Sequence, residues 1–348
     1  MAETEIFFLK TGEWHNFLKI ILSRFKVLAP KQGYYNPEYA LLGEEDSDKV
    51  LFPGARMTQP LKFFLYPPKE NVTQEITPPE KKTIILGVKA CDLKAIKILD
   101  HIYLDPDFID PFYKTRRENI LIISDDCPKP LDSCFCTLIG GEPFPTDGFD
   151  LNLSFLEQGV LVEIGSDKGK TLFSLIKTPL SKASQEQINQ RDNNRKTVTE
   201  ALQERNKEYA FPLEGLSQLI EDKYDSPEWK EACETCVGCM ACTNICPSCH
   251  CFLLIDETPV APGAKSKFNI KRSWDSCQST GFSRVAGGAN PRKKLTSRFA
   301  NRFHCKLQYK PRNYGIFACT GCGRCYEACQ GKIDVRQVLS LVAKEPVK

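Results

Sequence analysis

The sequence predicts an α/β domain followed by a mostly helical, cysteine-rich domain. Two observations lead to this prediction. In the N-terminal half, short runs of buried strand character alternate with helical patterns, which is typical of α/β layer domains. In the C-terminal half, closely spaced cysteines recur in one pattern that appears twice. A polar, charged segment at 178–207 separates the two halves, so we expect domains at 1–215 and 216–348.

The α/β prediction depends on one helical pattern and three strand patterns. Apolar residues repeat at helical spacing over 14–27. Residues 83–88 have the pattern of a buried strand and lead into a helical run, for which Asp92 is a plausible cap. Further buried strands are expected at 119–124 and 159–164. Three strands indicate a layered domain with at least partly parallel strands, but they do not determine its topology.

Length and composition exclude several classes of protein. The chain has 348 residues, which is enough for two domains of ordinary size. Charged residues make up 26% and hydrophobic residues 41%, so we expect most of the chain to be folded. The longest apolar runs fall far short of the ~20 residues that cross a bilayer, and the N-terminus has no pattern of an export signal. We therefore expect a cytoplasmic protein that does not insert into a membrane.

Cysteine is the unusual residue of this chain. It occurs seventeen times, an odd number, and it is bunched at two- and three-residue spacings. Such a set cannot be a fully paired disulfide framework, because residues this close in sequence are poorly placed to bridge each other. Metal ligation in a reducing cytosol is the better interpretation.

Two cysteine runs, at 236–246 and 319–329, share the spacing C-x2-C-x2-C-x3-C. This spacing wraps three consecutive thiolates around one face of an iron-sulfur cube, and the next helical turn carries the fourth thiolate towards a second cube. We therefore expect two [4Fe-4S] clusters whose ligand sets are crossed. The first set is Cys236, Cys239, Cys242 and Cys329, and the second set is Cys319, Cys322, Cys325 and Cys246.

The spacing of these runs also bears on the kind of metal and the kind of domain. Zinc is the alternative, but it needs only four ligands and does not call for the same progression twice. The insertion at 247–318 has 72 residues, far more than a minimal two-cluster ferredoxin needs, so we expect an alpha-helical ferredoxin domain. Cys329 is followed by Gln330 where a proline is usual. Cys233 is expected to be a spare, small, buried residue.

The N-terminal domain holds four further cysteines that could converge on a third cluster. Two of them, at 91 and 127, follow predicted strands, so in a parallel sheet both would lie at carboxyl ends, where ligands collect. The alternative is that these residues simply pack as buried thiols. The candidate ligands are Cys91, Cys127, Cys134 and Cys136.

The insertion between the two runs contains a second group of candidate ligands. Thiolate and imidazole both suit an iron-sulfur cluster or a zinc ion, so another metal site is one interpretation. In the alternative, these side chains only surround the paired clusters. The candidate ligands are Cys249, Cys251 and Cys277, with His250 and the pair His304 and Cys305 beside them in the sequence.

The basic residues are concentrated in one part of the chain. Residues 258–312 hold thirteen Lys and Arg against one acid, a local balance of +12, so the rest of the chain carries −9 within the net charge of +3. A basic stretch with interleaved aromatic residues could bind nucleic acid. It could equally dock an acidic partner, offset the negative charge of thiolate-bound clusters, or form a solvated face.

Several short, uncommon sequence motifs occur in one order along the chain, and together they show a family resemblance. The motifs are Gly87–Leu93, Arg116–Glu118, Cys134–Cys136, Gly148–Leu151, Val162–Gly169, Cys246–Phe252 and Trp274–Cys277. In this order they resemble the A-type subunit of anaerobic sulfite reductase and the beta subunit of cytosolic nickel-iron hydrogenases (sulfhydrogenases). The resemblance covers roughly residues 80–340. It implies an iron-sulfur electron-transfer subunit that stands between two others, one that binds flavin and nicotinamide and one that is catalytic.

We expect no substrate chemistry, and no flavin or nicotinamide, in this chain alone. Its sequence has no glycine-rich phosphate loop and no nucleophile turn, and none of its four histidines lies in a clear acid-base constellation. The leading hypothesis is a relay of electrons between a flavin/NAD(P)H subunit or ferredoxin and a catalytic subunit. The alternatives are an iron-sulfur protein that binds nucleic acid through 258–312 and an oxidoreductase that binds substrate at an open iron.

Overall fold

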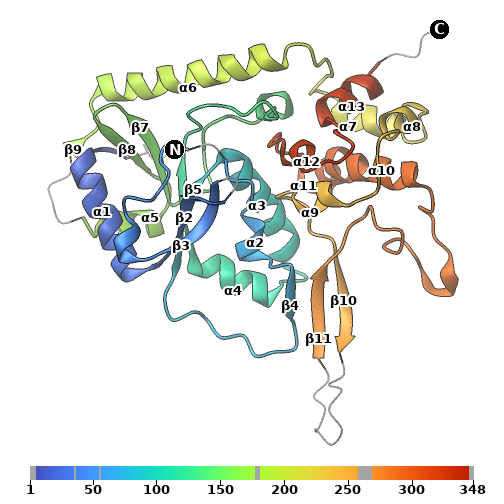
Figure 1. The fold of residues 1–348 in the computed structure, drawn as a ribbon, viewed down its shortest axis with the longest axis horizontal. Coiled ribbons are helices and arrows are strands. Elements are labelled where there is room, and N and C mark those ends of the chain that lie inside the picture. The colour runs from blue at the N-terminus through green and yellow to red at the C-terminus, as the bar shows by residue number, and fades with distance from the viewer. Residues whose placement is uncertain (1–4, 35–36, 55, 177–180, 258–268, 345–348) are drawn as a thin grey trace, which may run out of the picture. The chain divides into compact units, whose positions relative to one another are not determined.

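The chain folds into two compact units, each assembled from separate segments (Figure 1). The computed structural model describes residues 5–34, 37–54, 56–176, 181–257 and 269–344. The first unit comprises Met1–Gln59, Pro78–Lys97 and Arg116–Asn206, and the second comprises Pro60–Thr77, Ile98–Thr115 and Lys207–Lys348. The observed division therefore differs from the expected boundary at 215 in two ways. The chain changes unit at 206, and two short segments of the N-terminal half belong to the second unit.

The first unit is built on one eight-stranded sheet, in the order β3-β2-β5-β6-β7-β8-β1-β9. The four strands from β2 to β7 in this order are parallel, and the remaining pairings are antiparallel. The strands are β1 (Ile6–Lys10), β2 (Lys26–Gln32), β3 (Pro37–Leu42), β5 (Thr83–Val88), β6 (Ile120–Asp125), β7 (Leu151–Leu156), β8 (Gly159–Ile164) and β9 (Ser181–Lys182).

The predicted strands are all present in this sheet. Those expected at 83–88 and 159–164 have the predicted bounds, and the strand expected at 119–124 begins and ends one residue later. Parallel pairing of β5 with β6 confirms the partly parallel sheet. However, β8 forms an antiparallel hairpin with β7, because only two residues separate Leu156 from its partner Gly159.

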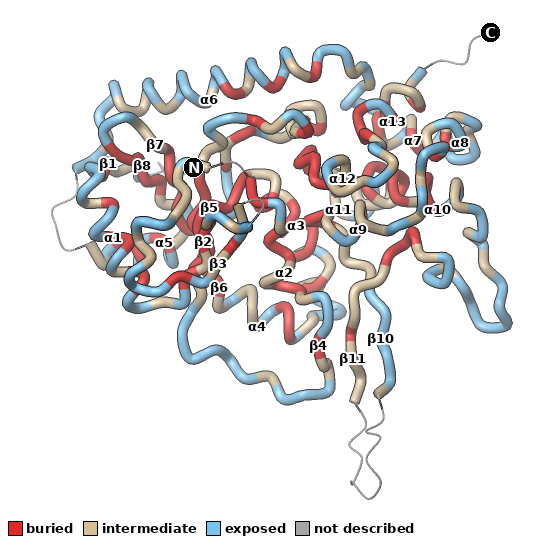
Figure 2. Tube along the Cα trace, viewed as in Figure 1, coloured by how far each residue is buried: buried red, intermediate tan, exposed pale blue. Residues whose placement is uncertain are grey.

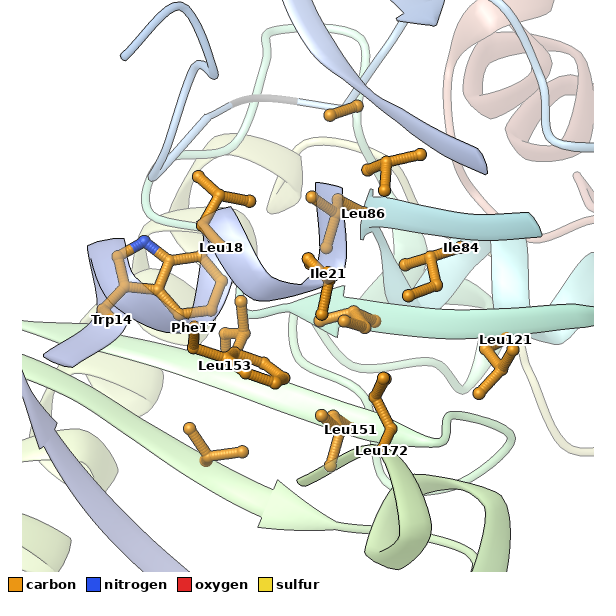
Figure 3. Close-up of a cluster of buried hydrophobic side chains, with 14 of the residues drawn as sticks. Trp14, Phe17, Leu18, Ile21, Ile84, Leu86, Leu121, Leu151, Leu153 and Leu172 are labelled. Atoms are coloured by element: carbon orange, nitrogen blue, oxygen red, sulfur yellow. The ribbon is translucent and has the colours of Figure 1, made fainter. Parts of the chain in front are cut away.

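The core of the first unit lies between this sheet and helix α1 (Thr11–Arg24). The helix, predicted from its apolar spacing at 14–27, turns Trp14, Phe17 and Ile21 towards strand residues such as Leu86 and Leu153 (Figure 3). All five side chains are buried. An amphipathic helix therefore covers one face of the sheet, and the hydrophobic effect fixes its position.

Other helices complete the first unit or carry the chain from one unit to the other. Helix α6 (Gln185–Asn206) occupies the polar segment expected to be a linker or a solvent-facing helix, and it buries only a few side chains. Helix α3 begins at Ala90, so Asp92 lies in its first turn and is not its cap. The remaining elements are α3 (Ala90–Tyr103), α4 (Pro111–Asn119), α5 (Asp167–Phe173) and the 3-10 turns η1 (Glu44–Asp46) and η2 (Cys136–Ile139).

The second unit combines helices with a small sheet. Its sheet has the antiparallel order β10-β11-β4, which the prediction of a mostly helical domain does not include. Figure 2 shows that β10 is exposed over most of its length. The elements are α2 (Lys62–Leu65), β4 (Lys69–Asn71), α7 (Leu216–Asp222), α8 (Glu228–Ala232), α9 (Ala241–Asn244), β10 (Phe252–Glu257), β11 (Asn269–Trp274), η3 (Ala286–Gly288), α10 (Leu295–His304), the π-helix η4 (Cys305–Tyr309), α11 (Lys310–Tyr314), α12 (Arg324–Glu327) and α13 (Val335–Val342). Across the described ranges, no helix combines the length and the apolar character needed to cross a membrane.

One buried carboxylate joins three elements of the first unit. Asp150, which precedes β7, accepts a hydrogen bond from the Ile122 backbone N–H in β6 at 2.7 Å. Its other oxygen accepts from the Ser166 hydroxyl at 2.5 Å, and Ser166 in turn caps α5 by accepting from the Gly169 N–H at 3.0 Å. A methyl group on Gly169 would lie 1.9 Å from the Asp150 carbonyl oxygen. Glycine is therefore required where α5 meets this junction.

Replacing Asp150 by Ala is expected to destabilise the first unit by roughly 3 kcal/mol, because the buried Ile122 N–H and the Ser166 hydroxyl both lose a charged acceptor. Urea unfolding followed by circular dichroism measures the change. The matched control is Asp167→Ala in the exposed first turn of α5, which should cost less than about 1 kcal/mol. Equal unfolding midpoints for the two variants would contradict this role of Asp150.

Candidate metal centre

The two cysteine runs fold into the same local structure. Gly238 and Gly321, at equivalent positions, have left-handed φ angles of 66° and 65°. Two residues later, Met240 and Gly323 are also left-handed, with φ angles of 64° and 74°. A one-turn helix then follows in each run, α9 in the first and α12 in the second. The repeat in the sequence is therefore a repeat in three dimensions. Met240 is the exception to glycine, and its conformation costs roughly 1–2 kcal/mol.

Each run is tied to the end of the other run. The Thr235 hydroxyl, just before the first run, donates to the Gly331 carbonyl just after the second run, at 2.9 Å. In the reciprocal contact, the Ser248 hydroxyl after the first run donates to the Ala318 carbonyl before the second run, at 2.5 Å. A methyl group on Gly331 would lie 2.1 Å from the Thr235 carbonyl oxygen, so this junction is closely packed. The fourth cysteine of each run is thus held beside the first three of the other.

The first predicted ligand set lines a common pocket. Its walls include Cys236, Cys239, Cys242 and Cys329, and also Arg302 and Cys325 of the second set. Burial raises the pKa of Cys242, and the neighbouring Cys236 and Cys329 add to this rise while Arg302 opposes it. The Cys329 sulfur accepts a hydrogen bond from the Ile333 backbone N–H at 3.4 Å. The structure therefore brings the four cysteines of this set together.

The second predicted set is also brought together, and it is more deeply buried. Burial raises the pKa of Cys325 to about 12, Arg302 opposes this rise, and Cys322, Cys319 and Cys246 strengthen it. Burial disfavours ionisation of these neighbouring thiols, so all four can be thiolates together only where a bound cation shares the negative charge. Iron in a cluster supplies that charge.

The two sets of cysteine ligands suit [4Fe-4S] clusters better than single metal ions. Among the residues that the structure describes, no group of three Cys, His, Asp or Glu side chains could hold a single metal ion. The ligands of a [4Fe-4S] cluster lie farther apart than those of one ion, because the iron and sulfide atoms of the cluster stand between them. Two sets of four thiols around backbone loops with left-handed turns fit this requirement.

Some cations of the basic stretch are buried, while others, such as Lys293 and Lys294, are exposed. Arg298, Arg302 and Lys306 recur every four residues along α10 and η4, and all three are buried. Burial opposes the charge of Arg302, yet Cys242 and Cys325, one from each ligand set, outweigh burial and hold the pKa of Arg302 above its usual value. Lys306 donates to the Cys246 sulfur at 3.1 Å. Arg302 and Lys306 offset the negative charge of the ligand sets, which was one of the four interpretations of this stretch.

The nucleic-acid alternative is not supported. It required an exposed basic stripe, but the helical spacing places the central cations of 258–312 against the cysteines. Part of that stretch, 258–268, lies outside the described residues. The orientation of α10 was not apparent in the sequence, although the four-residue spacing of Arg298, Arg302 and Lys306 was a usable signal.

Three of the four N-terminal candidates are close neighbours in the first unit. Burial raises the pKa of Cys127 and of Cys136 to about 12, and in each case Cys134 adds to the rise. Cys91 and Cys127 each lie three residues beyond the paired positions Val88 and Ser124 of β5 and β6. Both therefore follow the carboxyl ends of parallel strands, as expected. A third cluster at these residues stays a prediction.

The insertion cysteines also have sulfur neighbours. The thiols of Cys251 and Cys277 are close neighbours, and the thiol of Cys249 is a close neighbour of Cys246. Cys305 lies near Cys277. Cys233 is buried, as expected, and its being spare stays a prediction.

These arrangements define a class of protein, and comparison with known proteins agrees. A family model described as a 4Fe-4S dicluster domain matches residues 235–333, a range that contains all eight cysteines of the two runs. Residues 235–333 are thus a [4Fe-4S] dicluster domain, which supports two clusters.

The match to a particular family extends over most of the chain. The chain is 35% identical to the sulfhydrogenase 2 subunit beta of Pyrococcus furiosus over 293 residues, which is 81% of this chain and 82% of that protein. It therefore belongs to the family of this hydrogenase beta subunit, and it is an iron-sulfur electron-transfer protein.

Replacing Lys306 by Met should lower the reduction potential of the cluster bound near Cys246. A buried positive charge favours the reduced, more negative cluster by about 1–3 kcal/mol, which corresponds to roughly 40–130 mV for a one-electron couple. Redox titration followed by electron paramagnetic resonance measures the shift.

The matched control is Lys293→Met, which removes an exposed charge from the same basic stretch. Its potential should stay within about 20 mV of the parent value, since solvent screens exposed charges. Equal shifts in the two variants would show that Lys306 acts only through the net charge.

Proposed function

We propose that this chain relays electrons between a flavin/NAD(P)H-binding subunit, or ferredoxin, and a separate catalytic subunit of a hydrogenase-like or sulfite-reductase-like complex. The observation that carries the proposal is the packing of two four-cysteine sets around one buried arginine, Arg302. The identity to a hydrogenase beta subunit supports the hydrogenase-like complex. The metal-type spacing of the cysteines supports a reducing, cytoplasmic setting. The resemblance to a subunit of anaerobic sulfite reductase supports an anaerobic one.

The ligand sets in this proposal are crossed between the runs. Support comes from the reciprocal contacts of Thr235 with Gly331 and of Ser248 with Ala318. Because each contact fastens the end of one run to the start of the other, the fourth cysteine of each run faces the first three of its partner. Cys236, Cys239, Cys242 and Cys329 would hold one cluster, and Cys319, Cys322, Cys325 and Cys246 the other.

The protein's own residues would serve electron transfer in two ways. When bound, each [4Fe-4S] cluster supplies a one-electron couple. Arg302 contacts both ligand sets, so its charge stabilises added negative charge on either side of it. Backbone and side-chain donors to sulfur, such as the Ile333 N–H and Lys306, set the potentials further. No acid, base or nucleophile is needed for this role.

An exposed apolar strand supports the proposal that a partner subunit binds this chain. In β10, Phe252, Leu253, Leu254 and Ile255 are 37–53% exposed in succession. This strand is at the edge of its sheet, with β11 on one side. An exposed apolar edge strand readily pairs with another chain. We infer that a subunit of the complex packs on β10, since the related protein is itself a subunit.

Replacing Cys329 by Ser tests the crossed assignment. The loss should fall on the cluster whose other ligands lie in the first run, so about four of about eight iron atoms become labile while the second cluster keeps its signal. Cys246→Ser should have the reverse effect. Iron analysis and electron paramagnetic resonance of protein purified without oxygen distinguish the two clusters.

Selective loss of the second cluster in Cys329→Ser would show that each run holds its own cluster. Stoichiometric zinc in place of iron would remove the relay function altogether. Iron near twelve atoms per chain, rather than eight, would indicate a further cluster, such as one at the N-terminal cysteines.

Replacing Leu254 by Asp tests the docking strand. A charge in the middle of an apolar interface is expected to reduce the recovery of partner subunits with the tagged chain by at least about tenfold. The matched control is Leu213→Asp, another exposed leucine of the second unit, at 39% exposure. Equal recovery with both variants would place the partner on another surface.

A further inference from the structure

The first ligand set reaches the surface of the second unit, whereas the second set is buried more deeply. Cys239 of the first set is exposed, and Val237, another wall residue of the same pocket, is 67% exposed. In the second set, Cys246 and Cys322 are buried. Because electrons pass between proteins only over short distances, the first set is the one that a protein from outside can serve.

An exposed lysine lies at the rim of this pocket. Lys332 stands in the sequence between Gly331 and Ile333, and both of these neighbours line the pocket of the first set. Lys332 is exposed, and within the described ranges it forms no ion pair. Its positive charge is therefore available to a partner that approaches the first set.

Two further lysines reach the first run from the start of helix α10. Lys293 and Lys294 immediately precede Leu295, and a methyl group on Gly238 of the first run would lie 3.5 Å from Leu295 Cδ1. Both lysines are exposed, and neither is paired with a carboxylate of the described residues. Buried Arg298 donates to the Lys293 carbonyl at 2.5 Å. This contact holds the segment in place, so its two positive charges are presented beside the first run.

The charge around the first set is positive on balance. Two exposed carboxylates, Glu234 and Glu327, each lie two residues before a cysteine of this set. The three lysines outnumber them, and no acidic residue occurs between Asp275 and Glu327 in the sequence. A surface of one sign attracts a partner of the opposite sign and speeds its encounter. The partner that fits this surface is acidic.

This surface differs in kind from strand β10. The strand presents four apolar side chains in succession, which suits a subunit that stays bound. Around the first set, Val237 is surrounded by separate charges that solvent reaches. Small, charged contacts of this type are typical of brief encounters between electron-transfer proteins. The two surfaces therefore suit two different partners.

We propose that the surface formed by Val237, Lys293, Lys294 and Lys332 docks a small acidic electron-carrier protein at the first ligand set. This inference rests on the proposed relay and adds the place and the kind of its mobile partner. One electron passes from the reduced carrier, which becomes oxidised, to the cluster of the first set, which becomes reduced. No bond forms or breaks in this step, and no proton moves.

Charge reversal of the three lysines tests the docking surface. The variant is the full chain with Lys293→Glu, Lys294→Glu and Lys332→Glu, assembled without oxygen, and the probe is a purified acidic ferredoxin. Surface plasmon resonance measures its dissociation constant, and stopped-flow absorbance measures the second-order rate at which reduced ferredoxin reduces the chain. At low salt the affinity and the rate should both fall by at least about tenfold, because electrostatic steering is lost. High salt should lower the parent's rate towards that of the variant.

The matched control makes the same change in net charge on the first unit. It carries Lys19→Glu, Lys170→Glu and Lys196→Glu, all at exposed lysines of that unit. Its affinity and rate should stay within about threefold of the parent values, since solvent screens distant charges. Dithionite should reduce the parent and both variants to the same extent, which checks that their clusters are intact.

The other outcomes separate this proposal from the relay. Equal losses in both variants, or an undiminished affinity after charge reversal at the first set, would overturn the docking surface. So would duplex DNA that binds the parent more tightly than ferredoxin does. A parent that dithionite reduces but ferredoxin neither binds nor reduces would overturn the docking surface alone, whereas a parent that dithionite cannot reduce would contradict the relay itself. If the reversal variant does not fold, the parent decides, because a rate that falls with salt supports the proposal and a salt-independent rate overturns it.

Discussion

Positive charge inside the second unit is the condition on which its cysteine-rich structure depends. Thiolates that are packed together and partly buried are unfavourable unless positive charge offsets them. Arg302 provides this charge between the two ligand sets, and Lys306 provides it at Cys246. The spacing of these residues along α10 and η4 means that a single helical segment carries the compensation. The net charge of only +3 is thus the sum of a basic segment and an acidic remainder of the chain.

Hydrogen bonds between the two cysteine runs hold the ligand loops together. Thr235 and Ser248 fasten the start and end of opposite runs, so neither loop can take its shape alone. The insertion at 247–318 is therefore held at both ends by the ligand loops. Metal binding and folding of the second unit are expected to be coupled, because the loops gain their full set of contacts only together. The first unit has its own apolar core and does not share this dependence.

The sequence predicted the features that arise from local patterns. The strands β5 and β8, the helix α1 and the repeated cysteine spacing all follow from residues close together in the chain. Long-range pairing was not predictable in this way. The short strand β4 joins β11 far along the chain, which explains why 60–77 belongs to the second unit. Similarly, composition located the basic stretch. Whether its basic side chains point into the protein or towards solvent depends on how α10 packs, and so the sequence could not distinguish these two cases.

The central claim is that two cubane clusters lie next to each other on either side of Arg302. Electron paramagnetic resonance of the fully reduced chain at low temperature tests this most directly, since paramagnetic centres that are close together split and broaden each other's signals. The account predicts a simple spectrum when one cluster is reduced and an interaction-broadened spectrum when both are reduced. A fully reduced spectrum that is only the sum of two isolated centres, or one without any cluster signal, would contradict it.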